Sequence, residues 1–92
     1  MAHKTAEELK CALQKARERV LVRRQYFHYK HPELFYTIVD LVIIEETDGV
    51  GVLYRADYES LKGIGFLRPI ESFLDEVEIA GEKMKRFSLV EI

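Results

Sequence analysis

The first 20 residues place their apolar side chains at helical spacing. Residues three or four positions apart lie on one face of a helix, so these side chains form a single apolar stripe. Thr5 and Glu8 have the spacing of a capping box, in which each side chain bonds the other residue's backbone N–H at the start of a helix. The pattern predicts a helix from Thr5 to about Val20. Its apolar stripe consists of Ala6, Leu9, Leu13, Ala16 and Val20.

The single cysteine lies on the other side of this predicted helix. At 100° per residue, Cys11 falls nearly opposite the apolar stripe, close to Glu7 and Glu18. We therefore expect an exposed thiol. Acidic neighbours do not favour the thiolate, so an inert surface cysteine is expected rather than a reactive one.

After Val20 the apolar positions alternate, which is typical of β-strands. Pro32 is expected to break the first two strands apart, since proline lacks the N–H that a strand needs. Gly81 is expected to supply the positive φ of a tight hairpin, and Pro69 to open a short helical turn over 69–75. The predicted strands are 21–29, 35–46, 50–58, 64–68, 76–80 and 84–90.

The second predicted strand, 35–46, is apolar on both faces. Strict alternation places Asp40 on the same face as Ile38 and Val42. A strand of this kind is either central in its sheet or bent, so that each half serves a different part of the core. On such a face Asp40 would act as an acid or base with a perturbed pKa, or more commonly satisfy buried polar groups.

These elements predict a mainly β (α+β) protein. Six short strands with a helical turn before the last hairpin favour a small, strongly bent antiparallel barrel, and an SH3-like barrel is the nearest named shape. The helix would cover an open end or edge of the barrel. The expected organisation is a single domain, 1–92, with the N-terminal helix in 1–21 and the β-barrel in 22–91.

Composition agrees with one soluble domain. The chain has 92 residues, of which 48% are hydrophobic and 33% charged, a globular balance. One cysteine excludes an intramolecular disulfide, and the first residues lack the apolar stretch of a signal peptide. The longest strongly apolar run, Leu41 to Ile44, is far too short to span a membrane. We expect a cytoplasmic protein without membrane contact.

Charge is unevenly distributed along the chain. The net charge is −2, which does not suggest a nucleic-acid-binding protein. Residues 1–31 nevertheless carry eight Lys or Arg and three Glu, whereas residues 32–92 carry six Lys or Arg and thirteen Asp or Glu. The basic first segment can therefore attract an acidic partner, so self-association through the helix stays open. Its cations surround the helix and are interrupted by Glu, so weak phosphate contact is conceivable and sequence readout is not expected.

Residues 22–87 contain four motifs: Tyr26-Phe27-His28-Tyr29-Lys30-His31, Tyr54-Arg55-Ala56-Asp57-Tyr58, Phe66-Leu67-Arg68-Pro69 with Phe73, and Val77 with Gly81 and Arg86-Phe87. Together they resemble a family of small bacterial and phage domains that is catalogued only as a domain of unknown function. The resemblance implies a small β-barrel and no settled activity, and it leaves out the N-terminal helix. Three positions depart from the family pattern: Phe27 stands in place of Arg, Phe66 in place of Trp, and Ile44 in place of His. An activity that used those groups would be absent here.

The candidate ligand-binding residues are basic and aromatic. Arginine offers a fixed fork of donors for phosphate or carboxylate, and tyrosine offers a flat face for a planar group. If such a site exists, Arg55 and Arg68 are expected to carry much of the affinity. The alternative is that these residues only form structural pairs across strands. Arg55 and Asp57 also share one strand face, and sixteen acids are available to neutralise fourteen bases. The candidates are His28, Tyr29, Lys30, Tyr54, Arg55, Tyr58, Arg68 and Arg86.

Metal binding and catalysis have little support in the sequence. His28 and His31 supply half of a metal site, and nothing in the spacing requires Glu33 or Asp40 to complete it. The chain shows no nucleophile motif and no glycine-rich phosphate loop. We expect no cofactor and no catalytic residues.

Two classes of function remain. The first is a binding module that recognises a protein, a peptide or a small anionic ligand through a Tyr- and Arg-rich surface. The second is a small enzyme or nucleotide-handling domain that uses the same residues. The absence of a nucleophile–base pair favours the first class. Convergence of Arg55, Arg68 and Arg86 in one concave site without acidic partners would favour a ligand pocket.

Overall fold

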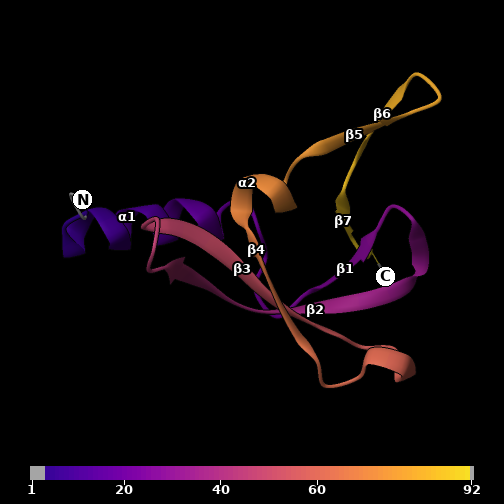
Figure 1. The fold of residues 1–92 in the computed structure, drawn as a ribbon, viewed down its shortest axis with the longest axis horizontal. Helices are drawn as coiled ribbons and strands as arrows, with labels where there is room; N and C mark the ends of the chain where they lie inside the picture. Colours follow the sequence, from indigo (N-terminus) through magenta and orange to yellow (C-terminus); the bar gives the residue numbers. More distant parts are fainter. Residues whose placement is uncertain (1–3, 92) are drawn as a thin grey trace.

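The structure, a computed structural model, describes residues 4–91. It contains a five-stranded antiparallel sheet of order β4-β3-β2-β1-β7, a separate two-stranded sheet of β5 and β6, and two α-helices (Figure 1). The elements in chain order are α1 (Ala6–Arg17), β1 (Gln25–His28), β2 (His31–Ile44), β3 (Gly49–Ala56), the 3-10 turn η1 (Glu59–Leu61), β4 (Gly65–Pro69), α2 (Ile70–Phe73), β5 (Glu76–Ile79), β6 (Glu82–Lys85) and β7 (Phe87–Leu89).

Helix α1 begins as the sequence predicts. The Thr5 hydroxyl accepts from the Glu8 N–H, and the Glu8 carboxylate accepts from the Thr5 N–H, so both halves of the capping box are present. The helix ends at Arg17, and Val20 lies in the turn that follows, where it is fully buried. Ala16 and Val20 join the core that also contains Ile38 of β2. The helix is therefore part of the hydrophobic core and not a detached arm.

Cys11 is exposed and unpaired, which confirms its predicted position. Because no folded segment covers the thiol, we expect an aromatic disulfide reagent to modify one group in the native protein. The rate should lie within a few-fold of the rate in denaturant. Labelling that appears only after denaturation would show that α1 lies with Cys11 turned inward.

Strand β2 is central in its sheet and bent. Its pairing with β3 shifts between Ile38 and Asp40, so Val39 is a β-bulge. The extra residue reverses the alternation, and Leu41 therefore faces the core beside Ile38. Asp40 is exposed, and its Oδ1 accepts the N–H of Leu41 at 2.8 Å. The prediction that Asp40 shares an apolar face with Ile38 was wrong because a bulge breaks strict alternation.

Two predicted strand boundaries were also wrong at the start of the sheet. Residues 21–24 form a turn, in which Arg23 has φ 69° and its N–H donates to the Ile38 carbonyl at 2.7 Å. Pro32 does not interrupt a strand, because the β1–β2 pairing passes from Phe27 with Phe35 to His28 with His31. Residues 32–34 fall in that irregularity, where a missing N–H removes no regular ladder bond.

The predicted last strand, 84–90, is divided in two at Arg86. Its N–H donates to the Asp75 carbonyl, and its carbonyl accepts from the Tyr29 N–H. The chain thereby leaves the β5–β6 sheet and joins β1 as β7. Seven strands result instead of six.

Strands β5 and β6 form a hairpin that projects from the rest of the molecule (Figure 1). Gly81 at its tip has φ 83°, as predicted. All residues of β6 and most of β5 are exposed, including Ile79 and Met84. The hairpin contributes little to the core.

The core lies on the face of the sheet that α1 and α2 cover. Phe73 of α2 stacks on Phe87 of β7, with ring centroids 4.3 Å apart and 8° between planes. In the described part of the chain, β4 and β7 at the two sheet edges make no backbone pair. The mainly β, antiparallel fold is confirmed, whereas closure into an SH3-like barrel is not. No described helix has the length and apolar character needed to cross a membrane.

Candidate functional site

Several of the predicted site residues gather around one hollow on the core side of the sheet, which we call the aromatic pocket. It has a volume of about 320 Å³. Aromatic rings form much of its wall, and four basic side chains stand around it. The lining residues are His28, Lys30, His31, Tyr36, Tyr54, Leu61, Phe66, Arg68 and Phe87.

Strand register brings the aromatic side chains together. Tyr54 of β3 pairs with Phe66 of β4, and their rings stack with centroids 5.6 Å apart. The Tyr36 ring of β2 meets both edge-on, at 5.4 Å from Tyr54 and 6.3 Å from Phe66. Phe87 approaches Tyr36 and Tyr54 from β7. Edge-to-face and stacked contacts of this kind hold rings in fixed orientations, so the wall is preformed.

Arg68 places a positive charge against this wall. It pairs with Val52 two residues before Tyr54, so it shares the core face of the sheet. Its guanidinium carbon lies 5.5 Å from the centre of the Phe87 ring, and Nη1 donates to the Ser72 hydroxyl at 3.0 Å. Within residues 4–91, no carboxylate lies close enough to form an ion pair with it. The fork is therefore oriented by neutral neighbours and keeps donors for a ligand.

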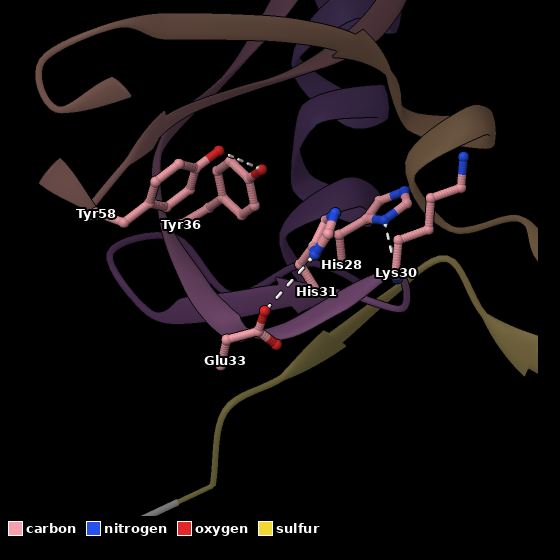
Figure 2. Close-up of polar contacts among 6 residues, drawn as sticks. All are labelled: His28, Lys30, His31, Glu33, Tyr36 and Tyr58. Atoms are coloured by element: carbon pink, nitrogen blue, oxygen red, sulfur yellow. Dashed lines mark hydrogen bonds and ion pairs between the residues drawn. The ribbon is translucent and has the colours of Figure 1, made fainter. Parts of the chain in front are cut away.

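His28 reports a positive environment. Burial lowers the pKa of His28, and the charges of Arg68, Arg86, Lys30 and His31 lower it further. Its Nδ1 accepts the Lys30 N–H at 3.2 Å, so this ring nitrogen is already occupied (Figure 2). A lowered pKa keeps the imidazole neutral at pH 7, and the permanently charged Arg68, Arg86 and Lys30 lie near it.

Tyr36 and Tyr58 form a hydroxyl pair beside the pocket. Their oxygens are 2.9 Å apart and point toward each other (Figure 2). Burial raises the pKa of Tyr36, and the hydrogen bond with Tyr58 adds to this effect. The Tyr36 hydroxyl therefore stays neutral at physiological pH and adds no negative charge to the site.

Arg55 lies on the other face of β3, away from the pocket. Arg55 directly follows Tyr54 in β3 and pairs with Gly65, so its side chain points to the opposite face of the sheet. Its Nε is 3.6 Å from an Asp57 carboxylate oxygen. Burial raises the pKa of Asp57, but hydrogen bonds from Thr37 and Gln25 and the charge of Arg55 bring it below its ordinary value. Arg55 is therefore engaged in an ion pair with Asp57, the acid that shares its strand face.

Two other candidates border the pocket without lining it. The Arg86 guanidinium is 3.7 Å from an Asp75 carboxylate oxygen, and this carboxylate would compete with an anionic ligand for Arg86. The Tyr29 ring packs on His28 with centroids 4.6 Å apart. Arg55, Arg68 and Arg86 thus do not converge without acidic partners, and Arg68 is the one whose placement suits a ligand.

Five pocket residues were not predicted as ligand-binding residues: His31 and Leu61, and the three aromatic residues Tyr36, Phe66 and Phe87. The sequence carried only a partial signal, namely that each of these aromatic residues lies in a predicted strand. Because Tyr36 belongs to β2 and Phe87 to β7, register across four strands was needed to place them together.

The pocket offers donors and ring faces rather than reactive groups. The Ser72 hydroxyl is hydrogen-bonded to Arg68, and His31 lies 3.6 Å from Glu33 on the rim. Throughout 4–91, no three His, Cys, Asp or Glu side chains are placed to share a metal ion. The arrangement is suited to holding a small anion that has a flat or apolar part.

Comparisons with known proteins identify one family. A family model described as "Protein of unknown function (DUF1653)" matches residues 24–89, which include every strand and leave α1 outside. Among solved structures, a protein of that family from Bordetella bronchiseptica superposes with a TM-score of 0.65 and 25% identity. The match covers 78% of this chain and 90% of that one. A search of curated proteins found no match.

Proposed function

The chain belongs to the DUF1653 family of proteins of unknown function, and we propose that it is a small binding module whose aromatic pocket takes a small anionic ligand. The ligand would carry a carboxylate or phosphate for Arg68 and a planar or apolar part for the rings. The ligand is either a free small molecule or a group displayed on a peptide or protein.

One observation carries this proposal: Arg68 is held by Phe87 and Ser72 and faces a pocket without an acidic partner. Arginines that serve only the fold usually pair with a carboxylate, as Arg55 and Arg86 do here. A guanidinium oriented in advance loses less entropy when a ligand binds, so it contributes more affinity.

The positive surroundings support an anion over a neutral ligand. Lys30 lines the pocket beside Arg68, and the charges of both add to the effect of burial in lowering the pKa of His28. The Lys30 ammonium lies 6.0 Å from the centre of the Tyr29 ring, and it forms no ion pair with a carboxylate among the described residues.

The bent sheet supports a further proposal, that the fold is an SH3-like barrel left open on one side. Arg68 of β4 lies over Phe87 of β7, so side chains from the two edge strands meet across the gap that backbone bonds do not close. The aromatic pocket would then be the mouth of this opening. A free cysteine suits a reducing compartment such as the cytoplasm.

We expect Arg68→Ala to weaken ligand binding by about 1.5–3 kcal/mol, the contribution of a hydrogen bond to a charged group. The probes are inorganic phosphate, nucleoside monophosphates and small carboxylic acids, screened by thermal shift and measured by calorimetry. A ligand at 100 times its Kd should add about 2.7 kcal/mol to the native protein.

Arg55→Ala is the matched control, because it removes the same side chain from the opposite sheet face. It should leave the Kd of any hit unchanged. If Arg68→Ala lowers the melting temperature while every probe binds as before, or if no probe binds the native protein, the pocket is not a ligand site.

A further inference from the structure

The seven arginines of the chain divide into groups by what they contact. Three pair with carboxylates: Arg19 with Glu71, and Arg55 and Arg86 as described above. Arg68 bonds Ser72 in the aromatic pocket. The remaining three, Arg17, Arg23 and Arg24, are exposed and have no side-chain hydrogen bond or ion pair among residues 4–91.

These three arginines are not scattered, because all of them line one shallow depression. It lies where α1 passes into β1, has a volume of about 530 Å³, and includes Leu21 and Asp40 in its wall. We call it the arginine depression. Arg23 and Arg24 also line a second hollow of about 370 Å³. The two arginines therefore stand between neighbouring hollows.

The backbone holds these arginines in place. Arg23 has φ 69°, a left-handed conformation that glycine usually occupies and arginine rarely does. Its N–H bonds the Ile38 carbonyl at 2.7 Å, and the Arg24 carbonyl accepts the Ile38 N–H at 3.1 Å. Unfavourable local conformations persist where the surrounding structure fixes them, and they are concentrated at binding sites.

The acid in the depression does not neutralise its cations. Asp40 lies outside ion-pair distance of all three arginines, and its Oδ1 already accepts the Leu41 N–H. Residues 10–24 carry six Lys or Arg and one Glu, so the excess extends along the helix. Leu21 is 39% exposed and offers an apolar surface between the charges.

From this placement we infer that the arginine depression binds the phosphate backbone of single-stranded nucleic acid. Each guanidinium fork matches a phosphate, and two adjacent hollows that share Arg23 and Arg24 suit successive phosphates of one strand. The exposed Leu21 gives a base or sugar an apolar contact. Such a surface holds the backbone and does not read sequence. This site is separate from the aromatic pocket and does not depend on it.

The test is fluorescence anisotropy with a labelled oligothymidylate of about 20 nucleotides. Three phosphate contacts predict that affinity falls about 20-fold between 50 and 200 mM salt. The triple variant Arg17→Gln/Arg23→Gln/Arg24→Gln should bind at least tenfold more weakly at 50 mM salt, with a logarithmic salt slope smaller by about 2.

Lys62→Gln/Lys83→Gln/Lys85→Gln is the control, because it removes the same charge from exposed positions elsewhere. It should stay within twofold of the native protein, as should Arg68→Ala, which tests the aromatic pocket separately. Absence of binding at 50 mM salt would overturn the inference, and so would an equal loss in the lysine control. Equal affinity for poly-glutamate would assign the depression to acidic polypeptides, and displacement by millimolar inorganic phosphate would reduce it to a small-anion site.

Discussion

Replacing Phe87 with alanine is expected to lower the free energy of unfolding by about 3–5 kcal/mol, the usual cost of deleting a buried aromatic side chain. Phe87 is 5% exposed and stacks on Phe73 at 4.3 Å. It also meets Tyr36 and Tyr54 edge-on, so its loss leaves a cavity between α2, β7 and the centre of the sheet. A domain of this size has roughly 5–14 kcal/mol of stability in total.

Urea unfolding followed by circular dichroism measures this loss. Leu67→Ala is the control, because Leu67 is 53% exposed and its truncation should cost less than about 1 kcal/mol. Equal losses in the two variants would mean that Phe87 is not in the core, and the position of β7 beside β1 would then be wrong.

Val20→Asp is expected to lower the melting temperature by about 16 °C or more. Val20 is fully buried in the core that joins α1 to the sheet. Burying a carboxylate without a partner costs upwards of about 4 kcal/mol, and each kcal/mol shifts the melting temperature of a small domain by about 4–8 °C. The family match begins at residue 24, so this variant asks whether the segment before it is required for folding.

Val39→Asp is the matched control, since it makes the same substitution at a position that is 40% exposed on the β2 bulge. It should change the melting temperature by only a few degrees. If Val20→Asp melted α1 alone and left the sheet with native stability, as seen by amide exchange, the helix would be an accessory to an independent β domain.

The helix was predictable because its signals are local. Thr5 and Glu8 specify the first turn by themselves, and the apolar stripe is read within one segment. The strand boundaries were less predictable, because they depend on pairing. Val39 bulges and Arg86 leaves one sheet for another, and each of these depends on hydrogen bonds to distant residues.

The candidate site was predictable in composition but not in arrangement. Arg55 and Arg68 look equivalent in sequence, as each sits in a recognisable motif with an aromatic residue one or two positions before it. Register separates them, because Arg68 shares a sheet face with Tyr54 while Arg55 points to the opposite one. The identity of a strand's neighbours therefore decides which arginine can meet a ligand.

The projecting β5–β6 hairpin is expected to open locally more often than the rest of the molecule. A two-stranded hairpin is marginal in water without a covering layer, and few of its side chains are shielded. Its amides should therefore exchange with deuterium through local opening, orders of magnitude faster than those of β2 and β3. Since Arg86 ties its far end to Asp75 and Tyr29, this opening stops before β7. The tip at Ala80 and Gly81 is thus a site where a reporter peptide could be inserted without unfolding the rest of the protein.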